Sequence, residues 1–378
     1  MTVRDNPMQE IVKNAGKEIQ GRGFLKKLNA YATNGGDDYI IDDQEKEWIN
    51  SALTRLVDYY DRVGDPDDEY WTQYSSCKIS DDLAVIVEFN VKQKKKTADK
   101  NNQSWFLLAV AAALYLPDEE SDKEHDTEDK EAIGKFCAIL QAVKSQFVRR
   151  FVMNCRGSGK FECSCFSAAK KLLNHRIDPN KDMSRELSSD IAYGDKEFKE
   201  KFKKYKAKLK PTKQSKKVLA DRRIVTYMLV SLSWKKDRSS QEVYPSECPW
   251  RHTKNDNSAD VQVEHILPQE PVKEGDDSNE FQCRWCMDDC TCTDQTWSHF
   301  SQRAREEYTQ RLGNLTLLSG DTNSRLSNAC WECKRKAYRT QELCWNKEIA
   351  EKKCWDCWSI ATRQTQMAEL AVQVWPGK

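Results

Sequence analysis

The sequence predicts an α+β protein in which a mainly helical N-terminal region precedes a small strand–strand–helix unit with flanking helices. Glycine and proline are sparse, at 14 and 10 of 378 residues, and residues that favour helices dominate the chain. Short strand-like segments occur near residues 261–265 and 314–318, where apolar and β-favouring residues gather. The 38% of hydrophobic residues is enough to build cores for two domains.

Helix-compatible segments fill the first half of the chain. We expect helices over residues 1 to about 65, with a break at Gly35 and Gly36, and then at 105–116, 131–152 and 163–173. The longest apolar run, 105–116, has about twelve residues, whereas a membrane-spanning helix needs roughly 20. We therefore predict a helical region over residues 1–215 that binds DNA or a partner protein, with no membrane association.

Residues 196–217 form the clearest charge run, with eleven lysines and only two glutamates. Apolar side chains recur within this run at helical spacing, at Phe198, Phe202, Tyr205 and Leu209. This pattern predicts an amphipathic helix that Pro211 ends, close to the boundary with the second half of the chain.

The lysine-covered faces of this expected helix have two interpretations. They are either a solvated basic surface or a surface that contacts a phosphate backbone, which would give salt-sensitive and sequence-independent affinity for DNA. The residues that we select as DNA contacts under the second interpretation are Lys203, Lys206 and Lys210. The near-neutral total charge of +1 does not exclude this, because clustering matters more than the sum.

The second domain is predicted to span residues 216–378. Val261 and Val263 alternate with polar neighbours, which indicates a strand that ends at Glu264 and His265. A second strand is expected at 314–318, followed by the loop 319–323 and a helix that begins near residue 324. This order would place Asn323 over the first strand.

Four polar residues in these segments suit metal-assisted hydrolysis of a phosphodiester. A neutral imidazole, here His265, can take a proton from water near neutral pH. The oxygens of Glu264 and Asn323 favour Mg²⁺ or Mn²⁺ over softer ions. Asn314, nine residues before Asn323, is expected to fix the loop or the imidazole by hydrogen bonds rather than to contact substrate.

The same residues lie in strings that resemble the HNH, or ββα-metal, nucleases. In detail they resemble the C-terminal nuclease domain of the GmrSD-type modification-dependent restriction endonucleases. The matching strings are residues 263–269 and 312–319, then Asn323, 326–328 and Lys334, with a weaker match at Trp358, Ile360, Arg363 and Trp375. The resemblance is specific from about residue 220 onward.

The resemblance implies an HNH-type endonuclease of a restriction or defence system, with DNA, modified or unmodified, as the substrate. It implies catalytic roles for His265 and Asn314 and metal-binding roles for Glu264 and Asn323. At the family position of Lys334 we expect contact with a DNA phosphate, and at that of Arg363 a structural pairing.

Cysteines are concentrated in and after an expected Cys-rich insertion at about 270–310. Pairs with two residues between the cysteines are the spacing of a structural Zn²⁺ site, and two such pairs could share one tetrahedral ion. The candidate ligands are Cys283, Cys286, Cys330 and Cys333. The alternative interpretation is a compositional bias, since these stretches are rich in Trp as well as Cys.

The sequence also gives expectations about the location of the protein and its partners. The first residues have no apolar core of the kind found in a signal peptide, so we expect a cytoplasmic protein, or a nuclear one in a eukaryote. Strings typical of the nucleotide-using domain of full-length relatives do not occur here. We therefore expect a nuclease half that is separately encoded, truncated, or dependent on a separate nucleotide-using recognition subunit. The alternatives left open are a catalytically inactive DNA-binding or regulatory subunit and a zinc-stapled interaction module.

Overall fold

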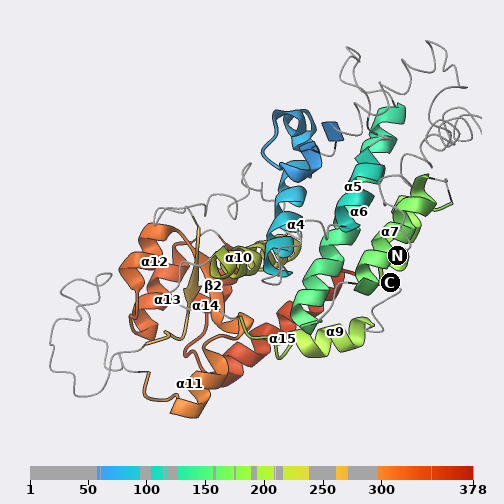
Figure 1. Ribbon diagram of the computed structural model, residues 1–378. Coiled ribbons are helices and arrows are strands. Elements are labelled where there is room, and N and C mark those ends of the chain that lie inside the picture. The colour runs from blue at the N-terminus through green and yellow to red at the C-terminus, as the bar shows by residue number, and fades with distance from the viewer. Residues whose placement is uncertain are drawn as a thin grey trace, which may run out of the picture.

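The computed structural model is built mainly from helices, with one small antiparallel sheet (Figure 1). This architecture confirms the predicted α+β class. The structure describes residues 58–59, 61–93, 104–113, 116, 127–155, 159–173, 176–188, 194–207, 209, 216–237, 261–270, 297–341 and 343–377. Among these residues, we find no helix whose length and apolar character would let it cross a membrane.

The helices of the first half largely follow the predicted segments. They are η1 (Glu69–Cys77), α4 (Ile79–Gln93), α5 (Ser104–Ala113), α6 (Thr127–Met153), α7 (Gly159–Leu173) and α8 (Pro179–Ser188). The expected helices at 105–116, 131–152 and 163–173 correspond to α5, α6 and α7. Most of the helix expected over residues 1–65 lies outside the described residues.

Helix α6 is the centre of this region, and its sequence explains why. Its apolar residues Ile133, Phe136, Leu140, Val143 and Phe147 are three or four positions apart, so they share one face of the helix, and all are buried. Helices α4, α5 and α8 pack around α6, as does the short helix α9 (Asp195–Phe202). The result is a helical layer with a continuous apolar core.

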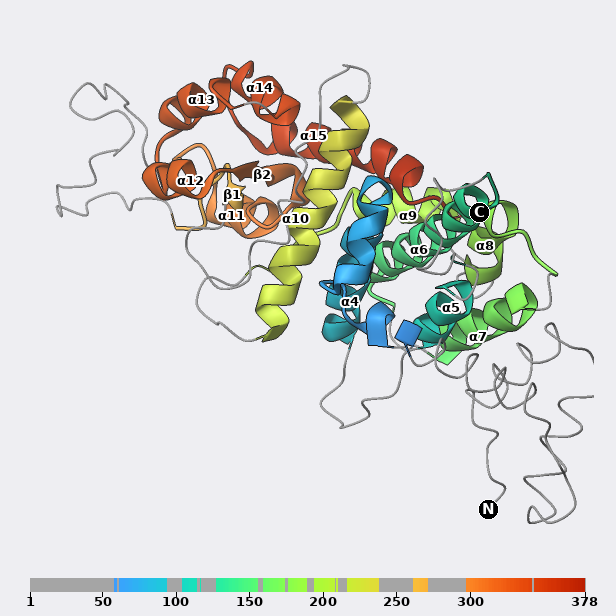
Figure 2. The ribbon, with the colours of Figure 1, turned by 90° about the horizontal axis from the view of Figure 1, so that it is seen from above.

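Helix α10 (Lys216–Asp237) joins this layer to the sheet. It lies between α4 on one side and the two strands on the other (Figure 2). Its middle turns are buried on nearly all sides, as expected for a helix that packs between two groups of elements. The predicted domain boundary at residues 215 and 216 stays a prediction, and one apolar core includes residues from both sides of it.

The helix predicted from the lysine run ends earlier than Pro211. After Phe202 the backbone leaves the helix and pairs with a distant segment: Ala207 N donates to Gln310 O at 2.7 Å, and Lys206 bridges Arg311. These long-range bonds replace the helical ones, which the local apolar spacing could not reveal. The apolar side chains of the run are nevertheless directed inward, and Phe198 and Phe202 are fully buried.

The sheet consists of β1 (Gln262–His265) and β2 (Leu315–Leu318) in antiparallel register. Glu264 pairs with Thr316, and His265 pairs with Leu315. A 3-10 turn, η3 (Leu312–Asn314), precedes β2, and α12 (Gly320–Leu326) follows it. The predicted strand–strand–helix order is therefore confirmed. Helix α12 begins about four residues earlier than expected, because the Ser319 side chain caps its N-terminus by accepting from Thr322 N.

The remaining helices enclose the sheet. They are α11 (Gln302–Tyr308), α13 (Trp331–Arg339), α14 (Cys344–Ala350) and α15 (Cys357–Val374). A second apolar core lies here, where the rings of Trp297 and Trp355 flank that of Trp331. Helix α15 runs from this core to the N-terminal helices, and its end at Trp375 is buried in the first core (Figure 1).

Candidate active site

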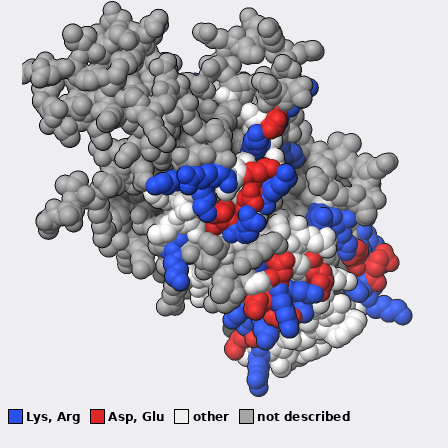
Figure 3. Space-filling view, turned by 90° about the vertical axis from the view of Figure 1, so that its right-hand side faces the viewer, with Lys and Arg blue, Asp and Glu red and all other residues white. Residues whose placement is uncertain are grey.

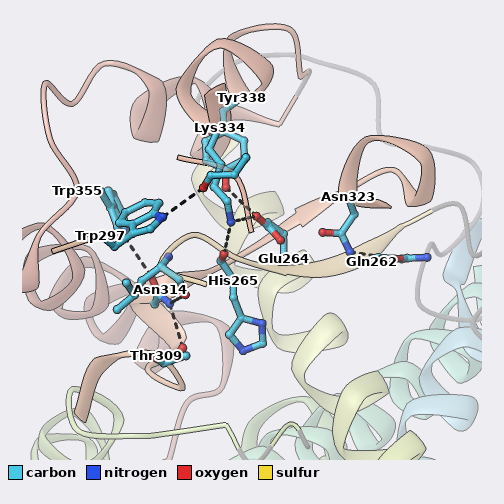
Figure 4. A network of polar contacts seen from close by, with 12 residues as sticks. Gln262, Glu264, His265, Trp297, Thr309, Asn314, Asn323, Lys334, Tyr338 and Trp355 are labelled. Carbon is cyan, nitrogen blue, oxygen red and sulfur yellow. Dashed lines mark hydrogen bonds and ion pairs between the residues drawn. The ribbon is translucent and has the colours of Figure 1, made fainter. Parts of the chain in front are cut away.

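The candidate site lies at the end of β1, where Glu264 and His265 are adjacent in the chain. Successive side chains of a strand point to opposite faces of the sheet. Accordingly, the Glu264 carboxylate is directed toward α13, whereas the His265 imidazole points away from it (Figure 4). The potential proton acceptor, His265, and the potential metal ligand, Glu264, are therefore neighbours in the chain whose side chains lie on opposite faces of the sheet.

The Glu264 carboxylate is buried and bound by two side chains of α13. Lys334 Nζ donates to Glu264 Oε1 at 2.5 Å, and the Tyr338 hydroxyl donates to the same oxygen at 3.2 Å. Lys334 Nζ also lies 2.7 Å from the His265 carbonyl oxygen. Burial raises the pKa of Glu264 and lowers that of Lys334, while their mutual attraction opposes both shifts.

Lys334 thus has a different position from the one predicted from the sequence. Its side chain is 0% exposed, and its ammonium group is bound to acceptors inside the domain. An amino group in this position does not reach a DNA backbone at the surface. We attribute its place in the matching strings to the buried pair with Glu264.

Asn314 secures the loop that follows β1. Its Oδ1 accepts from Leu267 N at 2.8 Å and from Trp355 Nε1 at 3.0 Å, and its Nδ2 donates to Leu267 O and Thr309 O at 3.0 Å. The side chain is fully buried and both of its polar atoms are used. Asn314 therefore has the loop-fixing geometry expected for it, and it is not placed to contact substrate (Figure 4).

The His265 imidazole lies between two glutamine amides. Its Nε2 is 3.0 Å from Gln269 Nε2 and 3.4 Å from Gln310 Oε1. Both amides also contact Leu209 O, so the segment after α9 helps to hold the ring in place. Burial, together with the positive charges of Lys334 and Arg222, lowers the pKa of His265 to about 4. The ring is consequently neutral at neutral pH, as a general base must be.

Asn323 comes from α12 and lies over β1, as the sequence predicted. Its Nδ2 donates to Gln262 Oε1 at 2.9 Å, which leaves Oδ1 as its remaining ligand atom (Figure 4). Gln262 and Glu264 are two residues apart in a strand, so both face the same side of the sheet. Asn323 and Glu264 therefore share one face, and His265 lies on the other.

The donors on this face suit a hard divalent cation. Both side-chain donors to Glu264 bind Oε1, so Oε2 has no side-chain donor among the described residues. Within the described part of the chain, no three His, Cys, Asp or Glu residues are grouped closely enough to hold a metal. An ion would therefore depend on one carboxylate oxygen, one amide oxygen, water and substrate, which is a ligand set typical of Mg²⁺.

The chain matches a known family, described as GmrSD restriction endonucleases, C-terminal domain, over residues 195–370. This match covers just under half of the chain and shows what that segment is similar to. The matched segment begins with α9 and includes all the site residues described above. A comparison with curated proteins found no match.

Helix α15 positions the turn that carries Asn314. Arg363 Nη1 donates to Gly313 O and Leu315 O, and Gln364 Oε1 accepts from Gly313 N at 3.1 Å. A Cβ atom at Gly313 would lie 2.3 Å from Ile360 O, so the close approach of α15 requires glycine. Arg363 has the structural role expected for it, in contacts with backbone carbonyls.

The sequence did not assign roles to Tyr338, Gln310 and Gln364. Tyr338 follows Lys334 by four residues, and this helical spacing is the one sequence signal that could have placed both on Glu264. Gln310 and Gln364 act through contacts with segments far away in the chain. No local pattern indicates such contacts.

The lysines selected as DNA contacts are partly neutralised by acidic neighbours. Lys203 pairs with Glu200 at 2.7 Å, and Lys206 pairs with Glu307 at 2.6 Å, whereas Lys210 lies outside the described residues. On the molecular face shown in Figure 3, basic and acidic side chains are likewise interleaved. DNA binding by these lysines stays a prediction, and any such contact competes with the acidic neighbours.

The structure describes one of the two candidate cysteine pairs. Cys283 and Cys286 lie outside the described residues. Cys330 and Cys333 are buried at the N-terminus of α13, with their Sγ atoms 3.1 Å apart, and Cys330 Sγ also accepts from Cys333 N. The two described thiols provide half of a tetrahedral ligand set, so the zinc site stays a prediction.

Proposed function

We propose that the GmrSD C-terminal domain of this chain is a metal-dependent DNA endonuclease of the HNH type, acting in restriction or defence. One observation carries this proposal. A strand in the segment that matches a restriction endonuclease family ends in a neutral imidazole and a carboxylate whose Oε2 has no side-chain donor among the described residues, and Asn314 secures the loop behind them. These are the parts that hydrolysis of a phosphodiester requires.

His265 is the general base in this proposal. The Gln269 amide nitrogen, 3.0 Å away, can only donate, so His265 Nε2 accepts from it and the ring hydrogen is on Nδ1. In this proposal the attacking water takes the place of Gln269 at Nε2, whose lone pair then accepts the proton. The low pKa keeps this nitrogen unprotonated throughout the neutral range.

Glu264 Oε2 and Asn323 Oδ1 are the proposed ligands of Mg²⁺ or Mn²⁺. When bound, such an ion would supply positive charge to the scissile phosphate and to the leaving oxygen. Asn314 and the α15 residues that hold its turn keep the loop after β1 in position. Lys334 and Tyr338 of α13 orient the Glu264 carboxylate by donating hydrogen bonds to its Oε1.

DNA, modified or unmodified, is the proposed substrate, and a separate nucleotide-using subunit is the proposed source of recognition. Both follow from the family and its full-length relatives rather than from a feature of the described residues. Reconstitution of modification-dependent cleavage with a second protein would test the subunit. Equal cleavage of modified and unmodified DNA by this chain alone would argue against it.

Nicking of supercoiled plasmid across a titration of Mg²⁺ and Mn²⁺ tests the activity. We expect His265→Ala to lower cleavage by roughly 100-fold or more, with a melting temperature close to wild type and no rescue by added ion. Asn323→Ala should need more ion and recover as the ion is raised. His299→Ala, an exposed histidine of the same domain, is the matched control and should cleave normally.

Two outcomes would decide against the mechanism. Cleavage by His265→Ala at the wild-type rate would remove His265 from the base role. Failure of the folded wild-type protein to cleave any plasmid with either ion would favour the alternative, a DNA-binding subunit that keeps the nuclease scaffold.

A further inference from the structure

We propose that Lys334 is a built-in counter-ion that occupies Glu264 in the metal-free protein and keeps the affinity for a divalent cation low until a DNA phosphate binds. This inference rests on the proposed function, because it concerns the same carboxylate. It assigns Lys334 a regulatory role in the site and Tyr338 a positioning role.

Lys334 is in direct contact with Glu264, the proposed metal ligand. The two side chains are 0% and 6% exposed, with 2.5 Å between Nζ and Oε1. The ammonium group also donates a hydrogen bond to the His265 carbonyl oxygen, 2.7 Å away, which holds it at the end of β1. Tyr338, one turn further along α13, donates to the same Oε1 at 3.2 Å. Both α13 side chains therefore act on one oxygen.

The contacts of Glu264 determine how a cation can bind. Oε1 is bound by Lys334 and Tyr338, so the carboxylate can offer only Oε2 to an ion. Fixing a ligand through its other atom is how outer contacts set the orientation of metal ligands. The carboxylate is thus prepared to bind a cation through one oxygen while it remains paired.

The charges explain why the affinity should be low without DNA. Among the described residues, Lys334 and Glu264 form an ion pair in which one positive charge balances one negative charge. Asn323 is neutral and adds no further charge. A divalent cation would therefore bring two excess positive charges next to a buried ammonium, and this repulsion is weakly screened inside a protein. A phosphodiester bound at the same ion would supply negative charge and offset the repulsion.

Metal and DNA should consequently bind with positive coupling, and the coupling should depend on the Lys334 charge. The decisive variant is Lys334→Gln, which removes the charge but keeps amide donors for Oε1 and the His265 carbonyl. Tyr338→Phe is the matched control, since it removes a donor from the same oxygen without changing the charge.

The experiment is calorimetric titration of Mn²⁺ into the full chain without DNA. We expect Lys334→Gln to bind Mn²⁺ at least about tenfold more tightly than wild type, and Tyr338→Phe to stay within about threefold of wild type. If Lys334→Gln is unfolded without ion, millimolar Mn²⁺ should refold it, because the ion replaces the missing positive charge beside Glu264.

Equal or weaker Mn²⁺ binding by folded Lys334→Gln would overturn the inference, as would failure of Mn²⁺ to refold an unfolded variant. An equal gain in Tyr338→Phe would also overturn it, because the effect would then not depend on charge. The proposed function fails separately: tighter Mn²⁺ binding by Lys334→Gln, together with a wild-type protein that cuts no DNA, would preserve the counter-ion and exclude the nuclease.

Discussion

Two buried lysine–carboxylate pairs among the described residues look alike, yet only one of them lies in the candidate site. In the N-terminal helices, Lys144 of α6 pairs with Asp82 of α4. In the segment that matches the GmrSD family, Lys334 of α13 pairs with Glu264 of β1. Both lysines are almost completely buried, so burial of an ion pair does not by itself indicate function.

The two lysines differ in their electrostatic balance. Burial disfavours the Lys144 ammonium, but Asp82 and Tyr227 together outweigh burial, and the pKa of Lys144 is raised. At Lys334 burial prevails over the attraction of Glu264, and the pKa is lowered. Burial raises the pKa of both carboxylates, Asp82 and Glu264, so the two pairs differ at the lysine. The Glu264 pair also lies beside a histidine and beside an asparagine whose amide oxygen is not used in the bond to Gln262, and these neighbours distinguish the candidate site.

Removing Lys144 should have the largest effect on stability and none on the site. We expect Lys144→Met to lower the free energy of unfolding by about 3–5 kcal/mol, because Asp82 is left buried without its partner. Denaturant unfolding measures this loss. Mn²⁺ binding by the folded fraction should match wild type. A change in Mn²⁺ affinity would show that the two pairs are coupled and would break the comparison.

Asn314→Ala should combine a structural and a functional effect. Loss of its hydrogen bonds leaves Leu267 N and Trp355 Nε1 unpaired in the interior, which we expect to cost about 2–4 kcal/mol of unfolding free energy. Plasmid cleavage by the folded fraction should also fall, since the loop after β1 loses its anchor. Undiminished cleavage per folded molecule would restrict Asn314 to a purely structural role.

The pH dependence of stability should separate the two regions further. Unfolded His265 binds a proton below its usual pKa of 6.5, whereas the folded ring does so only near pH 4. The folded state therefore loses stability as the pH falls from 6.5 to 4, by at most about 3 kcal/mol. Replacing His265 with Gln should remove this term, as seen in unfolding at several pH values. Lys201→Gln, at an exposed position of α9, should keep the wild-type pH profile and serves as the control.

The surface lysines should give the smallest effect. Replacing Lys203, Lys206 and Lys210 with glutamine should weaken DNA binding and reduce the salt dependence by at most about one unit of slope per lysine. Because Glu200 and Glu307 already pair with the first two, we expect a reduction below that limit. Glu307→Gln frees Lys206 and should strengthen binding. An unchanged salt slope in the triple variant would leave these lysines as a solvated surface.

Local patterns were sufficient for much of the fold. The helix-compatible segment at 131–152 predicted α6, and the alternation at Val261 and Val263 predicted β1. Such patterns succeed because they record which side of an element must be buried. They failed after Phe202, where bonds from Ala207 to Gln310 end the helix that the lysine run predicted.

The sequence by itself determined the order of the elements and the residues at the end of β1, including the position of Asn323 over that strand. Only the tertiary structure decided which partners those residues have. Lys334 meets Glu264 across 70 positions of the chain, and Trp355 meets Asn314 across 41. Side-chain type and spacing specify local backbone conformation, but pairing across such distances depends on how helices pack. For that reason the role of Lys334 became visible only in the folded domain.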